Sequence, residues 1–351
     1  MLKKLGSIFL FLGIVAGSGW FILAARKDSL QDQFQTAFFD AAKGRRVEVV
    51  SEYYDALGVS GMLHALEEKD LLCHFQAHEV GKVAYKKMQD LNEAIKTCGS
   101  SCTGGYFHGA LIEAFKDIVP KPDAPESHIE LADLRDKMRE LCSREIVIDI
   151  HREGKCFHGV GHALTFLSGY SHLDAAISYC QLLGDKPREH YCAEGAFMEY
   201  NFSDEAVPQQ QSGEISHYPC DTYTEFPAAC YRSKSQKLRQ VLKTADKVGQ
   251  ECLKLDRPNR LGCFYGTGFA FSNHVRANPR FLPSLCGQGN LDDQRMCIEG
   301  AMEKPEDPRL MASVEACEYI SSELKGFCLT AFNSKSYSLT KSFELYFDNT
   351  K

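Results

Sequence analysis

Histidine spacing is the feature of this sequence that most directly suggests chemistry. The stretch KCFHGVGHAL, residues 155–164, places His158 and His162 four residues apart, just after Cys156. In a helix, residues four apart stand on one face, so both imidazoles can reach the same point. This spacing predicts a site for a metal ion.

Two earlier segments carry histidine at nearly matching positions. His108 lies six residues after Cys102, as His162 does after Cys156, and Cys73 is followed by a further pair of histidines four residues apart. Later segments have other residue types at these places, so histidine is not a requirement of the fold. We therefore predict a metal site built from His74, His78, His108, His158 and His162.

The ligand type narrows the choice of metal. Imidazole nitrogens suit zinc, copper or iron, and they do not suit calcium or magnesium. The five histidines could form one mononuclear site or two close sites. Glu194 occupies the place in its segment that His158 occupies in the preceding one, and Glu113 lies five residues after His108, so either could be a ligand or a general base. The alternative is that the histidines only pack between helices.

Cysteine spacing predicts the fold that carries these histidines. The chain has 15 cysteines. From Cys142 onward they form six successive pairs separated by 10 to 14 residues, and the second members recur every 31 to 38 residues. This period is typical of arrays of two-helix units. The predicted disulfides are Cys142 with Cys156, Cys180 with Cys192, Cys220 with Cys230, Cys252 with Cys263, Cys286 with Cys297, and Cys317 with Cys328.

Each pair is expected to join two helices of a hairpin, the first cysteine ending helix A and the second beginning helix B. Glycine follows the second cysteine by three residues in most repeats, as Gly195 follows Cys192. We expect it to let helix B approach the helix A to which it is joined. Cys98 with Cys102 would add a seventh bridge, while Cys73 could pair with either or remain a thiol.

On these paired cysteines, repeat lengths and small residues, the chain resembles bacterial cysteine-rich helical-repeat proteins related to tetratricopeptide repeats. The resemblance covers roughly residues 50 to 335. It implies an all-α fold of about seven to eight disulfide-joined αα-hairpins, arranged as a curved solenoid or a compact helical array. It also implies a groove that binds a peptide or an envelope protein.

The amino terminus predicts a membrane anchor. Lys3 and Lys4 precede 21 uncharged, mostly apolar residues, 5–25, and about 20 such residues can cross a bilayer as a helix. So many disulfides require an oxidising compartment. We therefore expect a single-pass protein of the inner membrane with most of the chain in the periplasm. The alternative is a cleaved signal segment and a secreted protein.

The expected organisation follows the cysteine pattern. The segments are an anchor or signal (1–27), first hairpins with the histidine cluster (28–118), a proline-rich linker (119–128), disulfide-joined repeats (129–335) and a carboxy-terminal cap or tail (336–351).

Two functional hypotheses of different class remain. A net charge of −7 without a basic, aromatic-rich block argues against nucleic acid as a partner, and no nucleophile elbow, phosphate loop or dinucleotide motif occurs. The first hypothesis is a membrane-anchored transition-metal protein, with catalysis left open. The second is a periplasmic interaction scaffold without chemistry.

Overall fold

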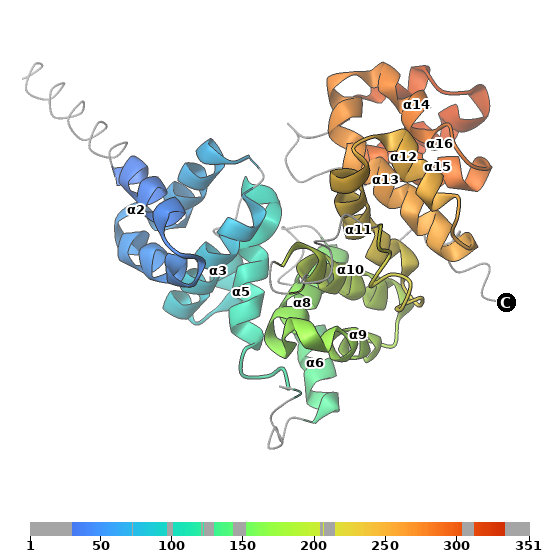
Figure 1. The fold of residues 1–351 in the computed structure, drawn as a ribbon. Helices are drawn as coiled ribbons and strands as arrows, with labels where there is room; N and C mark the ends of the chain where they lie inside the picture. The colour runs from blue at the N-terminus through green and yellow to red at the C-terminus, as the bar shows by residue number, and fades with distance from the viewer. Residues whose placement is uncertain are drawn as a thin grey trace, which may run out of the picture. The chain divides into compact units, whose positions relative to one another are not determined.

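The computed structural model describes the chain over residues 30–71, 73–96, 101–120, 122, 130–142, 152–203, 206, 215–303 and 312–333. These residues form fourteen α-helices and several short 3-10 helices, with no β-strand among them (Figure 1). The predicted all-α class is confirmed for this part of the chain. The chain divides into two compact units, the first ending at Gly109 and the second beginning at Ala110.

The first unit packs its helices around apolar side chains such as Phe34, Phe38 and Met62, which are fully buried. Gln35 fastens the first helical segment to the next helix by donating to the Ala65 carbonyl at 2.7 Å. The boundary between the units falls within α5. The elements up to that point are residues 30–40, η1 (Lys43–Arg45), α2 (Arg46–Lys69), α3 (His74–Met88), α4 (Leu91–Lys96), η2 (Ser101–Gly104) and α5 (Gly105–Phe115).

The second unit is a succession of helices in which α8, α10, α11, α13 and α15 pack on one another in that order. Short helices precede most of these long ones. The elements are α6 (Leu131–Leu141), α8 (Arg152–Ser168), η3 (Tyr170–His172), α9 (Leu173–Gln181), α10 (Lys186–Phe202), α11 (Pro227–Leu242), α12 (Ala245–Cys252), α13 (Arg257–Ala277), η4 (Pro279–Phe281), α14 (Leu282–Cys286), α15 (Leu291–Met302), η6 (Val314–Glu318) and α16 (Ser322–Asn333).

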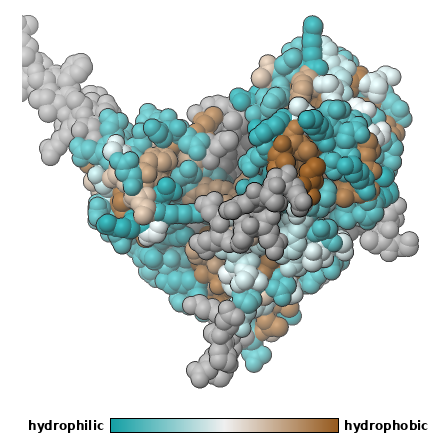
Figure 2. All heavy atoms as spheres, viewed as in Figure 1, coloured by the Kyte–Doolittle hydropathy of each residue, from teal (hydrophilic) through white to brown (hydrophobic). Residues whose placement is uncertain are grey.

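Apolar side chains pack between the helices. Phe197 of α10 and Tyr231 of α11 are fully buried in the core of the second unit. The face drawn in Figure 2 is mainly hydrophilic, with apolar residues showing between the polar ones. Among the described residues, the large apolar side chains that stay exposed are spread along the chain from Leu131 to Val314.

Seven disulfides join the described cysteines, and the six pairs predicted from Cys142 onward are all confirmed. Their Cα atoms lie 5.4 to 5.6 Å apart, the usual separation for a disulfide. The seventh joins Cys73 to Cys102, which was one of the open alternatives. A bridge between Cys98 and Cys102 is therefore wrong, and Cys98 itself lies outside the described residues.

The glycine three residues after the second cysteine has a different partner from the predicted one. A Cβ added at Gly195 would lie 1.8 Å from the carbonyl oxygen of His158, and one at Gly300 would lie 2.0 Å from that of Tyr265. Both oxygens belong to the long helix of a neighbouring hairpin. The prediction that this glycine packs against its own disulfide-joined helix is therefore wrong, because the glycine sets the crossing of two long helices instead.

Four helix pairs share this crossing: α3 with α5, α8 with α10, α13 with α15, and α11 with α13. In each pair, a carbonyl one or two residues after a cysteine meets a glycine three residues after a later cysteine. The couples are His74 with Gly105, His158 with Gly195, Tyr265 with Gly300, and Tyr231 with Gly266. Side chains next to these crossings therefore occupy equivalent positions.

Several predicted segments lie outside the described residues. These are the anchor or signal (1–27), most of the linker (119–128) and the cap (336–351). In the part of the chain that is described, no helix combines the length and the apolar character needed to cross a bilayer.

Candidate metal centres

Three buried histidines lie together in the first unit. Gly105 of α5 packs on the carbonyl of His74, at the start of α3, and Gly109 packs on that of His78. Because the two backbones touch, His108 of α5 is brought beside both histidines of α3. Its Nδ1 atom lies 3.1 Å from Nε2 of His74. All three side chains are buried.

The rings of these three histidines contact one another. Ring centroids are 4.8 Å apart for His74 and His108, 5.1 Å for His74 and His78, and 5.7 Å for His78 and His108. A tetrahedral zinc ion with Zn–N bonds of about 2.1 Å puts neighbouring ligand nitrogens about 3.4 Å apart, and the 3.1 Å between Nδ1 of His108 and Nε2 of His74 is close to that spacing. His74 and His108 are therefore two candidate ligands of the first unit whose nitrogens already lie side by side.

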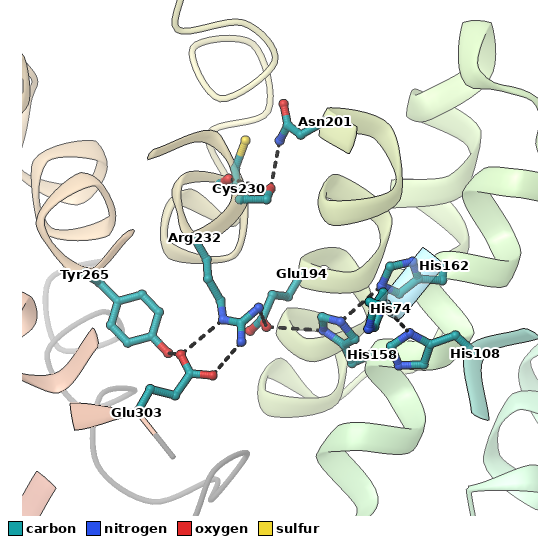
Figure 3. A network of polar contacts seen from close by, with 11 residues as sticks. His74, His108, His158, His162, Glu194, Asn201, Cys230, Arg232, Tyr265 and Glu303 are labelled. Atoms are coloured by element: carbon teal, nitrogen blue, oxygen red, sulfur yellow. Dashed lines mark hydrogen bonds and ion pairs between the residues drawn. The ribbon is translucent and has the colours of Figure 1, made fainter. Parts of the chain in front are cut away.

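Two further histidines face each other in the second unit. His158 and His162 lie one turn apart on α8, and their Nε2 atoms are 3.2 Å apart. Two carboxylates of α10, one on each side of Gly195 in sequence, stand behind the rings. Nδ1 of His162 donates to Glu199 at 2.8 Å, and Nδ1 of His158 lies 3.2 Å from Oε1 of Glu194. Figure 3 shows Glu194 and the two histidines.

The hydrogen bond to Glu199 determines where the proton of His162 lies. An ionised carboxylate only accepts hydrogen bonds, so Nδ1 of His162 carries the proton, and a neutral His162 then presents an unprotonated Nε2. Nε2 of His158 lies 3.2 Å from this nitrogen, so the two nitrogens share either a proton, in an N–H···N hydrogen bond, or a metal ion. The order carboxylate, Nδ1–H, metal-bound Nε2 is the usual one in protein metal sites.

The surroundings of His158 disfavour its protonated form. Burial is the main reason why the pKa of His158 lies well below its usual value of 6.5, and the positive charges of His162 and Arg232 lower it further. The neutral imidazole is the form that binds a metal. His158 is therefore kept in the ligand form at neutral pH.

At the equivalent place in the α13/α15 pair, the positive charge is an arginine side chain. Tyr265 and Phe269 of α13 stand where α8 has its two histidines, and Glu303 stands at the end of α15 where α5 has its histidine. The guanidinium of Arg232, from α11, lies 4.1 Å from the centroid of the Phe269 ring and makes two bonds to Glu303. The crossing thus accommodates a positive charge among aromatic and acidic side chains.

The structure brings most of the predicted residues together within each unit. The first unit gathers His74, His78 and His108, and the second gathers His158, His162 and Glu194. Glu113 instead forms an ion pair with Lys116, which lies three residues further along the chain, just after the end of α5. Glu194 stands behind a histidine rather than among the ligand nitrogens. That all five histidines serve one site stays a prediction.

Three residues of the second group were not predicted from the sequence: Glu199, Tyr170 and Arg232. The Tyr170 hydroxyl donates to Oε1 of Glu199 at 2.8 Å, and Arg232 forms an ion pair with Glu194 at 3.0 Å. Glu199 lies four residues after Gly195, on the same helix face. It could have been found once the partner of that glycine was known, whereas no spacing points to Arg232.

No family model, no curated protein and no solved structure matches this chain. The resemblance to cysteine-rich helical-repeat proteins therefore stays an expectation drawn from the cysteine pattern. The structure does contain buried histidine and glutamate side chains that could hold a metal ion.

Proposed function

We propose that this chain is a disulfide-rich helical protein that binds transition-metal ions through its histidines, at the α3/α5 crossing in the first unit and the α8/α10 crossing in the second. The observation that carries the proposal is the pair of Nε2 atoms of His158 and His162, 3.2 Å apart with a carboxylate behind each ring. A metal ion bound by both nitrogens would take the place of the proton that they otherwise share.

Zinc, copper and iron are the ions that this ligand set suits. Every first-unit candidate ligand is an imidazole, and in the second unit the carboxylates contact Nδ1 atoms, which leaves nitrogen as the common donor. Nitrogen ligands select these metals over calcium and magnesium.

The third helix pair supports the choice of a cation as the ligand. At the α13/α15 crossing the equivalent positions carry Tyr265, Phe269 and Glu303, and the positive charge there is the guanidinium of Arg232. Where histidines replace these residues, no guanidinium is needed because an imidazole nitrogen binds a metal ion directly. The histidines thus stand at positions that the fold uses for holding a cation.

The location of the protein is part of the proposal. Seven disulfides favour an oxidising compartment, and the apolar run of residues 5–25 favours a membrane anchor. We place the chain in the inner membrane as a single-pass protein with its body in the periplasm. There the joined hairpins would continue as a repeat array of about seven to eight units, open to an envelope protein or peptide.

Elemental analysis of the full-length chain, purified from an oxidising compartment, tests this function. The wild type is expected to carry zinc, copper or iron, or to take up added Zn²⁺ at micromolar concentration. His78→Ala and His162→Ala, one in each group, should each lower the bound metal, and the double variant should abolish it. His64→Ala and His274→Ala are the matched controls, since both side chains are exposed, and they should leave the metal content unchanged.

A metal-free wild type that takes up no Zn²⁺ would overturn the proposal. The two Nε2 atoms of α8 would then share a proton, and the histidines would be packing residues of an interaction scaffold. Circular dichroism and non-reducing mass mapping of each variant establish that lost metal does not reflect lost helices or disulfides.

A further inference from the structure

Arg232 connects the histidine pair of α8 to the far helices of the second unit. It is a buried residue of α11, and its guanidinium lies between a carboxylate of α10 and one at the end of α15. Figure 3 shows this chain of contacts from His158 through Glu194 and Arg232 to Glu303 and Tyr265. Glu194, Arg232 and Glu303 each contact a partner on two sides, so none of the three can turn without disturbing the next.

The contacts on Glu303 hold the guanidinium in one orientation. Nε and Nη2 of Arg232 both bond this carboxylate, Nε at 3.2 Å, and the Tyr265 hydroxyl donates to it at 2.8 Å. The face of the guanidinium lies on the Phe269 ring at 4.1 Å. Planar two-bond pairing fixes direction as well as distance. The remaining nitrogen, Nη1, is thereby aimed at Glu194.

One oxygen of Glu194 serves two partners. Oε1 lies 3.0 Å from Nη1 of Arg232 and 3.2 Å from Nδ1 of His158. A carboxylate on a flexible glutamate side chain could swing toward the Nε2 side of the ring and become a ligand. The charge of Arg232 holds it on the Nδ1 side, where it sets the tautomer of His158.

We propose that Arg232 is a positioning residue of the second-unit histidine site: by holding Glu194 against Nδ1 of His158, it makes this histidine present Nε2 to the metal ion. The inference rests on the proposed metal-binding function. Glu199, behind the other histidine, is held by the Tyr170 hydroxyl instead, so the two carboxylates are positioned by different means.

A double-mutant cycle on full-length protein tests this role, with Co²⁺ as the probe. All variants carry His78→Ala, so that Co²⁺ reports on the second-unit histidines. Arg232→Met should weaken Co²⁺ binding about 10-fold, the lower end for outer-shell partners, and should shift the visible absorption bands of the bound ion. Arg232→Lys, which keeps the charge but not the two-bond geometry, should recover part of the affinity. Arg260→Met is the control, because Arg260 pairs with Asp293 and should change neither readout.

The cycle separates positioning from mere stability. If Arg232 acts through Glu194, then Arg232→Met should have little further effect on affinity or spectrum in a Glu194→Gln background, since coupled residues are not additive. Additive effects, or an unchanged spectrum in folded Arg232→Met, would overturn the inference. If Arg232→Met does not fold, Arg232→Lys decides between a positioning role and a purely stabilising one. A wild-type Co²⁺ spectrum in Arg232→Lys would contradict the positioning role.

A metal-free measurement distinguishes this inference from the proposed function. In ¹⁵N-histidine-labelled protein without metal, His158 should be the Nδ1–H tautomer in the wild type and should lose that preference in Arg232→Met. If the wild type binds no Co²⁺, the proposed function fails, while this tautomer change still supports Arg232 as the residue that positions Glu194. An unchanged tautomer refutes the positioning role whatever the metal result.

Discussion

The α8/α10 and α13/α15 pairs of the second unit share one backbone arrangement and differ in the charge they hold. In both, a glycine of the second helix packs directly on a carbonyl of the first, at His158 and at Tyr265. The α8 side chains next to the crossing are histidines backed by carboxylates. Their α13 counterparts are aromatic: Phe269 lies against the guanidinium of Arg232, and Tyr265 donates to Glu303, the carboxylate that pairs with it.

This difference separates what cysteine and glycine do from what the neighbouring side chains do. The disulfide joins a long helix to the short helix before it, and the glycine fixes where the long helix crosses its neighbour. Only then do the residues two and six places after the cysteine, His158 and His162 or Tyr265 and Phe269, decide the chemistry. The same backbone crossing can thus carry histidines in one helix pair and aromatic residues beside an arginine in another.

The crossing glycines are the strongest test of the shared backbone. Gly195→Ala and Gly300→Ala should each destabilise the second unit by about 3 kcal/mol, the upper part of the range for overpacking. The new Cβ would lie only 1.8 or 2.0 Å from a carbonyl oxygen, so the two helices must separate. Urea unfolding followed by circular dichroism measures the loss, and Gly195→Ala alone should also release metal from the second unit.

Gly326→Ala on α16 is the control for this pair of variants. An added Cβ at Gly326 meets nothing within 4 Å, so alanine should raise stability there by about 0.5 to 1 kcal/mol through its helix propensity. Equal unfolding midpoints for Gly195→Ala and the wild type would show that the crossing is not the feature that the two pairs share.

Lys234 provides the second test, because it is another buried cation on the same helix as Arg232. Its Nζ has no hydrogen-bond partner within the described part of the chain, and burial lowers its pKa from 10.5 to about 8, with Asp221 opposing and Lys237 adding to the shift. Arginine cannot lose its proton, whereas lysine can. The comparison therefore predicts that Arg232, which has carboxylate partners, stays charged at high pH, whereas Lys234 loses its proton.

The sign of the resulting pH dependence is fixed by the lowered pKa of Lys234. Below pH 8 the native and unfolded states both carry the proton, and the fold bears the full cost of burying it. Between about pH 8 and 10.5 only the unfolded state keeps the proton, so stability should rise by about 1.4 kcal/mol per pH unit. Lys234→Met should abolish this rise and increase stability at pH 7.

Lys247→Met, at an exposed position of α12, should keep the wild-type pH profile. Urea midpoints at pH 7, 8, 9 and 10 give the comparison. A wild-type midpoint that stays level from pH 8 to 10 would mean that Lys234 keeps its proton in the fold.

The two carboxylates behind the histidines should differ in a measurable way. Glu199→Gln should weaken metal binding at the second-unit site about 10- to 100-fold, because it removes a full negative charge behind His162. Glu194→Gln should fall at the lower end of that range, since Arg232 already shares its charge. Competition with a coloured zinc chelator, in the His78→Ala background, gives both affinities.

Glu189→Gln is the matched control on the same helix. Glu189 is also buried, but it pairs with Lys186, so its loss should leave metal affinity unchanged. A Glu194 effect larger than that of Glu199 would contradict the idea that Arg232 shares the charge of Glu194.

Sequence pattern was sufficient for the features that depend on short separations. Cysteine pairs 10 to 14 residues apart could be matched because each hairpin closes locally, as in Cys252 with Cys263. The Cys73–Cys102 bridge spans 29 residues, and three cysteines competed for it. The five histidines were found because their spacing departs from that of the later repeats.

Features that depend on contacts between hairpins could not be predicted. Helical geometry places the glycine and its cysteine on one face but does not say which neighbour that face meets, so the sequence alone predicts the wrong partner helix for Gly195. Arg232 and Glu303 are 71 residues apart, and no repeat links them. Their pairing is evident only from the packing of α11 between α10 and α13.

The starts of α10 and α15 give the smallest predicted difference between the pairs. Asp185 caps α10 by accepting from the backbone of Arg188, whereas Asn290 and Asp293 form a reciprocal capping box at α15. Asp185→Ala removes the side-chain acceptor of this cap and should cost about 1 kcal/mol. Asn290→Ala leaves the Asp293 half of the box in place and should cost about 0.5 kcal/mol. Amide hydrogen exchange in the first turn of each helix measures both, and faster exchange in Asn290→Ala than in Asp185→Ala would reverse the assignment.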